Sequence, residues 1–164
     1  MATIIVEDGS NVAGANSYVT VVEFTQFCSD RNITIVNTYG DESQLLIQAM
    51  DYFEQQPFKG IKNVETQALQ FPRSDLWIDS YLEPSDQIPK LVKDAQITIA
   101  VSFMQDYSPL STVDRVAKRE KVDVLEVEYM DNASATPILR SIGNIMRKLV
   151  TSSTFGSNFA TIRA

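Results

Sequence analysis

The sequence predicts a mainly α (α+β) fold, with about four helices around a central helix, one β-hairpin and extended N- and C-terminal arms. Apolar residues recur at helical spacing in four separate segments, one further segment alternates like a strand, and a Ser/Thr/Gly-rich stretch ends the chain. A chain of 164 residues has room for one such domain with a substantial core. We therefore expect residues 1–150 to form a single helical domain and residues 151–164 a flexible C-terminal arm.

The N-terminal residues 2–7 are rich in β-branched side chains and are expected to form a short strand or an extended arm. A helix is expected after Thr20, because Thr20 and Glu23 have the spacing of a capping box, and it should end near Asn32. Its apolar face would consist of Val21, Phe24, Phe27 and Cys28.

A second helix is expected from about Asp41 to about Gln56, where Pro57 ends it. Its acidic first turn suits the positive end of the helix dipole. The apolar stripe at helical spacing consists of Leu45, Leu46, Ala49, Met50 and Phe53.

The third helix is expected over residues 89–107, and its apolar residues cover several sides. Other elements must therefore enclose it, which makes it the central helix. A fourth helix is expected to begin at Thr136 and Pro137, a cap residue followed by a proline in the first turn. Its apolar stripe consists of Ile138, Ile142, Ile145 and Leu149.

Residues 57–89 show no lasting period and contain three prolines between positions 66 and 89. A loop of this length is uncommon in a compact domain unless it is functional or packs on itself. Its aromatic residues favour a packed lobe that covers the core. The alternative is that two of its side chains, Arg73 and Trp77, face a partner.

Residues 116–130 alternate between apolar and charged residues, and the phase of the alternation shifts in the middle. Such a shift indicates two strands joined by a tight turn near Asp123 and Val124. The segment is basic at its start and acidic at its end, as in Arg119, Lys121, Glu126 and Glu128, with Tyr129 following. Opposite charges on facing strands would form cross-strand pairs, each contributing about 0.2–1 kcal/mol.

This hairpin is not predicted to bind a nucleic-acid backbone. Between residues 115 and 131 there are four basic residues and five acidic ones. Release of counterions from phosphates, the main source of non-specific DNA affinity, needs an excess of cations. A two-stranded hairpin is only marginally stable alone, so it should lie on the helices or pair with a neighbouring chain.

The composition excludes several classes of function. The net charge is −7, which disfavours polyphosphates and anionic membrane surfaces. The chain has no histidine and one cysteine, so the Ser-His and Cys-His nucleophile pairs, His-ligated zinc and an intrachain disulfide are excluded. We expect no enzyme, cofactor, metal site or membrane contact. No secretion signal is visible, so synthesis in a cytoplasm is expected.

The C-terminal arm, residues 151–164, is too polar to fold alone and contains no acidic residue. It could be disordered, or it could become ordered when it binds a partner. In the second case its contact residues would be Phe155, Phe159, Ile162 and Arg163.

Four segments in order resemble a group of tailed-phage proteins: IIVEDGSNVAGANSYVTVVEF (4–24), TQALQFPRSD (66–75), IPKLVKDAQ (88–96) and KREKVDVLEVEYMD (118–131). The group carries the label DnaT-like, single-stranded-DNA-binding protein, and it is also similar to head–tail connector (adaptor) proteins. Relatives often have Gly at the hairpin turn where this chain has Asp123.

The resemblance implies a structural virion protein of the neck, made in the host cytoplasm. It would form a ring, commonly of twelve copies, between the portal protein and the next neck or tail protein, and would serve genome packaging and ejection. Twelve copies at −7 carry about 84 negative charges, which would let DNA pass through the ring without specific binding. The alternative is a single-stranded-DNA-binding protein, which needs a positive groove with exposed aromatic rings.

Overall fold

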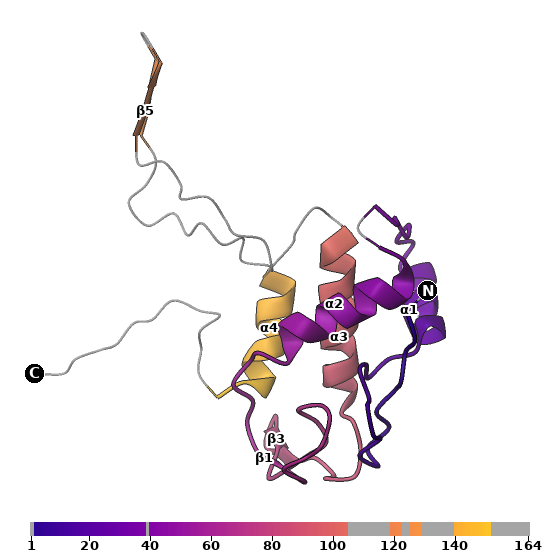
Figure 1. The fold of residues 1–164 in the computed structure, drawn as a ribbon. Coiled ribbons are helices and arrows are strands. Elements are labelled where there is room, and N and C mark those ends of the chain that lie inside the picture. The colour runs from indigo at the N-terminus through magenta and orange to yellow at the C-terminus, as the bar shows by residue number, and fades with distance from the viewer. Residues whose placement is uncertain (1, 39, 105–118, 123–124, 129–139, 152–164) are drawn as a thin grey trace, which may run out of the picture.

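Four helices form the body of the protein (Figure 1). The computed structural model describes residues 2–38, 40–104, 119–122, 125–128 and 140–151. The helix bounds are α1 Val21–Asp30, α2 Glu42–Phe53, α3 Lys90–Met104 and α4 Arg140–Leu149. Helix α3 packs against both α2 and α4, and α1 packs against α2. The predicted fold class, mainly helical with a small β content, is confirmed.

The first helix begins after the predicted cap Thr20, and the second begins close to the expected position, with Asp41 as its cap rather than in its first turn. Thr20 accepts a hydrogen bond from the Glu23 amide, and the Glu23 side chain accepts one from the Thr20 amide, which completes the capping box of α1. Asp41 and Gln44 form the same arrangement at α2. Both helices end two to three residues earlier than expected, because their last turns close through local backbone bonds that periodicity does not reveal.

The central position of α3 is confirmed by its burial. Nine of its residues are buried, and they lie on several sides of the helix: Val92, Ala95, Gln96, Ile97, Ile99, Ala100, Ser102, Phe103 and Met104. The expected end of this helix, residues 105–107, and the expected start of the fourth helix at Thr136 and Pro137 lie outside the described residues.

Four aromatic rings fill the core between the helices and the lobe, residues 57–89. Tyr18, Phe53, Phe58 and Phe71 are buried, with ring centroids 4.7–6.1 Å apart in the five pairs that touch. Most of these pairs are edge-on or tilted, as aromatic quadrupoles prefer. The expected packing of the lobe over the core is therefore confirmed at Phe71.

The lobe contains regular structure that the sequence did not predict. β1 (Ile61–Lys62) pairs with β2 (Arg73–Ser74), and β3 (Trp77–Ile78) pairs with β4 (Tyr81–Leu82), both antiparallel. Two-residue strands are too short to show an alternating pattern. Gly60 has a positive φ of 74°, and a Cβ there would lie 2.5 Å from the Ser74 carbonyl oxygen, so this close approach requires glycine.

The hairpin predicted over residues 116–130 is confirmed in its described part. β5 (Arg119–Val122) and β6 (Leu125–Glu128) are antiparallel, with Arg119 opposite Glu128 and Lys121 opposite Glu126. The turn predicted near Asp123 and Val124 lies outside the described residues. Figure 1 draws the hairpin away from the lobe.

The N-terminal arm is extended and is joined to the body by a parallel bridge between Val6 and Ser17. The C-terminal arm is described only at Thr151, and its remaining residues lie outside the described part of the chain. Within the described residues, no helix combines the length and apolar character needed to cross a bilayer.

Candidate functional site

The β3–β4 hairpin, residues 77–82, is a tight projection of the lobe that we call the finger. Its register places Trp77 opposite Leu82 and Ile78 opposite Tyr81, which leaves Asp79 and Ser80 as a two-residue turn. Both turn residues have positive φ, 50° and 72°, as in the turn type that suits the twist of a short hairpin. Aspartate adopts this conformation more readily than most residues.

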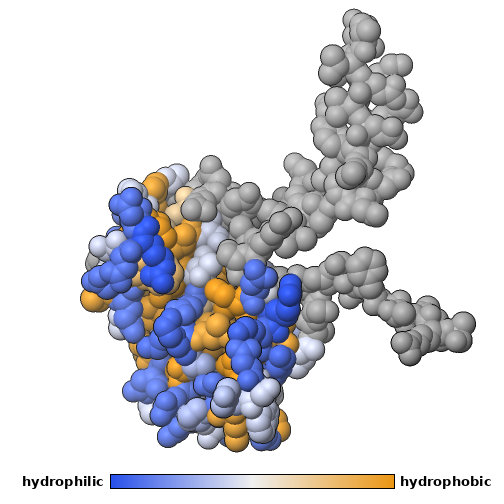
Figure 2. Space-filling view, turned by 180° about the vertical axis from the view of Figure 1, so that it is seen from behind, coloured by the Kyte–Doolittle hydropathy of each residue, from blue (hydrophilic) through white to orange (hydrophobic). Residues whose placement is uncertain are grey.

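The finger exposes large apolar side chains to solvent. Trp77 is 55%, Tyr81 75% and Leu82 55% exposed, and Ile61 on β1 of the same lobe is 64% exposed. Apolar atoms reach the surface at the lower end of the body in Figure 2, where Figure 1 places the lobe. A group of large exposed apolar side chains marks an interaction surface more often than a single one does.

Contacts with the end of α4 hold the lobe in place. Lys148 Nζ lies 2.5 Å from Asp79 Oδ2 in the finger turn, and Lys59 Nζ donates to the Lys148 carbonyl at 3.0 Å. The chain after α4 forms an antiparallel bridge between Val150 and Phe58, with backbone bonds on both sides of it. The finger is therefore attached to a rigid support rather than to a free loop.

Arg73 holds the lobe together from within. Its Nε donates to the Lys59 carbonyl at 2.7 Å, its Nη2 to the Gly60 carbonyl at 2.7 Å, and its Nη1 to Gln70 Oε1 at 2.9 Å. The side chain is half-buried. These hydrogen bonds give Arg73 a structural role within the lobe. Its predicted contact with a partner stays a prediction.

A buried polar network joins the end of α2 to the lobe. The Glu54 carboxylate accepts hydrogen bonds from the Tyr18 hydroxyl at 2.9 Å and from the Gln70 amide at 2.8 Å. The Phe71 amide in turn donates to the Tyr18 hydroxyl oxygen. Burial raises the pKa of Glu54 to about 7, although these hydrogen bonds, together with Lys62 and Arg73, oppose the shift.

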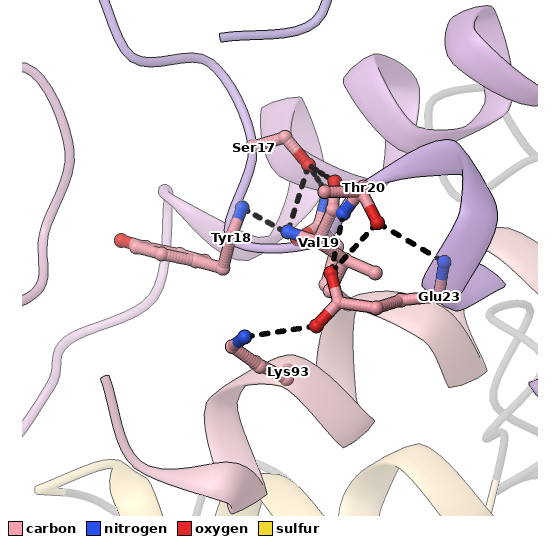
Figure 3. A network of polar contacts seen from close by, with 7 residues as sticks. Ser17, Tyr18, Val19, Thr20, Glu23 and Lys93 are labelled. Atoms are coloured by element: carbon pink, nitrogen blue, oxygen red, sulfur yellow. Dashed lines mark hydrogen bonds and ion pairs between the residues drawn. The ribbon is translucent and has the colours of Figure 1, made fainter. Parts of the chain in front are cut away.

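A second network fixes the start of α1 against α3, and Figure 3 shows its members Ser17, Tyr18, Glu23 and Lys93. Gln96 of α3 accepts from the Tyr18 amide at 2.9 Å and donates to Ser17 Oγ at 2.8 Å and to the Leu46 carbonyl at 3.2 Å. Lys93, one turn earlier on α3, pairs with Glu23 at 3.0 Å. These contacts serve the fold, since each buried polar atom finds a partner within the body.

Charge is unevenly distributed over the surface. Residues 2–104 contain fourteen acidic and six basic side chains, a net charge of −8. The basic residues of the lobe are Lys59, Lys62 and Arg73, and Lys148 of α4 pairs with Asp79 of the finger. Among the described residues, no group of three or more His, Cys, Asp or Glu side chains is placed to hold a metal ion.

The structure brings together some of the predicted contact residues. The four charged hairpin positions, Arg119, Lys121, Glu126 and Glu128, face one another in register, whereas Arg73 and Trp77 lie in separate two-stranded sheets of the lobe. The other five predicted residues lie outside the described part of the chain: Tyr129, Phe155, Phe159, Ile162 and Arg163.

Sequence reasoning missed Ile61, Tyr81 and Leu82 as exposed members of the lobe surface. A signal was present in the stretch WIDSYL, residues 77–82, where apolar pairs flank Asp-Ser. Aspartate and serine are common turn residues, so the stretch fits a two-residue hairpin loop.

The comparison with protein families gives one match: a family described as "Putative DnaT-like ssDNA binding protein" matches residues 2–164. Neither the curated proteins nor the solved structures contain a match.

Proposed function

The chain belongs to this DnaT-like family, and we propose that it is a head–tail connector subunit, one copy in a ring through which phage DNA passes without being bound. The support comes from the character of its surface and from the resemblance of four segments to phage connectors. In this proposal the chain is made in the host cytoplasm and is incorporated at the virion neck, between the portal protein and the next neck or tail protein.

The observation that carries the proposal is an exposed apolar finger on an acidic body. Trp77, Tyr81 and Leu82 offer area that a protein partner would bury, and aromatic residues are enriched at the centres of such interfaces. The net charge of −8 over residues 2–104 repels a phosphate backbone. A subunit that contacts proteins and repels DNA suits a ring that surrounds a moving duplex.

The hairpin fits the same role. Its register sets Arg119 opposite Glu128 and Lys121 opposite Glu126, so residues of opposite charge face each other twice across the strands. A two-stranded hairpin gains stability when a neighbour covers or extends it. In a ring, the adjacent subunit or the next ring would supply that surface.

The experiment that tests the proposal is quantitative mass spectrometry of purified particles of the encoding phage. We expect the chain at a fixed copy number per portal ring. A phage replication protein, measured in the same preparation, controls for carry-over from the lysate. Absence of the chain from particles that contain portal protein would refute the connector.

A second candidate function is single-stranded-DNA binding, which the family description favours. One structural feature agrees with it: Trp77 and Tyr81 are exposed in the same lobe as Lys59 and Lys62. Stacking of a base on an exposed aromatic ring contributes about 1–3 kcal/mol, which would favour binding of a single strand. However, the lobe as a whole contains five acidic and three basic residues, which weakens its attraction for phosphates.

The two candidates differ in how they respond to salt. For a DNA-binding protein, the anisotropy of a labelled oligothymidine should report binding that falls steeply between about 50 and 200 mM salt. For the connector we expect no saturable binding over this range. Trp77→Ala, compared with Val36→Ala at another exposed site, shows whether any binding involves stacking on the finger.

A further inference from the structure

We propose that the finger of one copy binds the C-terminal arm, residues 152–164, of a neighbouring copy. The inference rests on the proposed ring, because it names the contact between subunits. It joins two features that the fold leaves unused: an exposed apolar surface, and a terminal segment with regularly spaced apolar residues.

The arm carries its apolar residues in a pattern that suits such a surface. Phe155, Phe159 and Ile162 stand at positions i, i+4 and i+7, the spacing at which one helical face presents anchors to an apolar surface. The remaining residues are small or polar, so these three are the only large apolar groups that the arm can bury.

The finger offers a pair of exposed apolar anchors on one face, where Trp77 and Leu82 lie directly opposite each other. Tyr81 pairs with Ile78 and therefore lies on the other face of the finger. The paired strands and the contact between Lys148 and Asp79 hold the finger in place before binding. A surface arranged in advance loses little conformational freedom when a ligand binds.

The charges of the two partners are complementary. Residues 57–89 contain five acidic and three basic side chains, a net charge of −2, whereas the arm has Arg163 and no acidic side chain. The side chains of the lobe, with their net negative charge, therefore do not repel a peptide whose only charged side chain is basic.

The direction of the chain at the end of α4 favours a neighbour's finger over its own. The Lys59 amide donates to the Leu149 carbonyl, and the Thr151 amide donates to the Pro57 carbonyl. Residues 149–151 therefore run antiparallel to residues 57–59, toward the end of α2 and away from the strands of the lobe.

Trp77 is the only tryptophan in the chain, so its fluorescence reports directly on the finger. In the full-length protein, we expect its emission to shift to shorter wavelength as protein concentration rises, because the ring becomes buried when copies associate. The full-length variant Phe155→Ser/Phe159→Ser should keep the emission of an exposed tryptophan at every concentration. Adding a synthetic peptide of residues 152–164 to this variant should restore the shift.

A labelled peptide tests the same contact from the other side. Its anisotropy on titration with the Phe155→Ser/Phe159→Ser protein should rise to saturation. Replacing Leu82 or Trp77 of that protein with alanine should weaken binding about tenfold or more, as truncation of a central anchor does. Val64→Ala, an exposed apolar residue of the lobe outside the finger, is the matched control.

Three outcomes would overturn the inference: no shift on adding the peptide, equal binding by the Trp77 variant, or a shift that is independent of protein concentration, which would place the arm on its own finger. A peptide that is displaced by oligothymidine in low salt would instead assign the finger to DNA. None of these results decides whether the chain is in the particle, so the connector proposal is tested separately by mass spectrometry.

Discussion

Tyr18 and Glu54 are joined by a 2.9 Å hydrogen bond in which the phenol hydroxyl donates to the carboxylate. The same hydroxyl accepts a bond from the Phe71 amide, and the other carboxylate oxygen accepts from the Gln70 amide. One side chain from the segment before α1 and one from the end of α2 thus hold the lobe, and with it the finger. The network holds the lobe against the folded body. A surface that contacts a partner must be held in this way.

This network makes stability depend on pH. Burial raises the pKa of Glu54 from 4.5 to about 7 in the folded protein. Between these values the native state keeps a proton that the unfolded chain has lost, so stability falls as pH rises through this window. We expect the free energy of unfolding of the wild type, relative to Glu54→Gln, to decrease from pH 5 to pH 8, no more steeply than about 1.4 kcal/mol per pH unit.

Urea denaturation at several pH values measures this difference. Glu65→Gln, at an exposed glutamate of the lobe, should give the same pH profile as the wild type. Parallel profiles for the wild type and Glu54→Gln would show that Glu54 titrates alike in both states, contrary to the structure.

Gln96 should be among the polar residues most important for stability. Replacing it with leucine removes the acceptor of the Tyr18 amide and leaves that buried donor without a partner, at a cost of about 1–3 kcal/mol. Chemical denaturation measures the loss. Gln55→Leu, at an exposed position just after α2, is the control and should change stability by less than about 0.5 kcal/mol. A Gln96→Leu protein as stable as this control would contradict the described network.

The cap of α1 gives a smaller and more local prediction. Thr20→Ala removes the acceptor for the Glu23 amide and should cost about 1 kcal/mol. Thr25→Ala, inside the same helix, should change little, since its hydroxyl bonds only to the preceding turn. Thermal denaturation compares the two variants, and equal melting temperatures would argue against the capping box.

Removal of the C-terminal arm should separate folding from assembly. The truncation should stop after Thr151, because the Thr151 amide and hydroxyl both bond to the Pro57 carbonyl. We expect the protein without residues 152–164 to keep its circular dichroism and melting temperature but to sediment as a monomer. Particles that incorporate the truncated chain at the normal copy number would show that the arm is dispensable.

Patterns that depend on local chemistry could be predicted from the sequence. The cap Thr20 and the acidic first turn near Asp41 placed two helix starts, and the enclosed character of α3 followed from apolar residues on several of its sides. The register of β5 and β6 followed from the shift in alternation near Asp123. Each of these signals comes from residues within a few positions of one another.

The lobe surface could be predicted only in part, since exposure depends on contacts distant in sequence. Phe71 and Trp77 are both aromatic and close in the chain, yet Phe71 is buried among three other rings and Trp77 is 55% exposed. What separates them is the register of a two-residue hairpin and its attachment to α4, 69 positions away between Asp79 and Lys148. A periodic pattern within the lobe predicts neither the hairpin register nor the contact with α4.

Electron microscopy of the virion neck is the decisive test of the proposed connector role. We expect a ring of copies of this chain below the portal, with the acidic body around the DNA channel and each finger buried against protein. A neck without this chain, together with purified protein that captures oligothymidine at physiological salt, would contradict it.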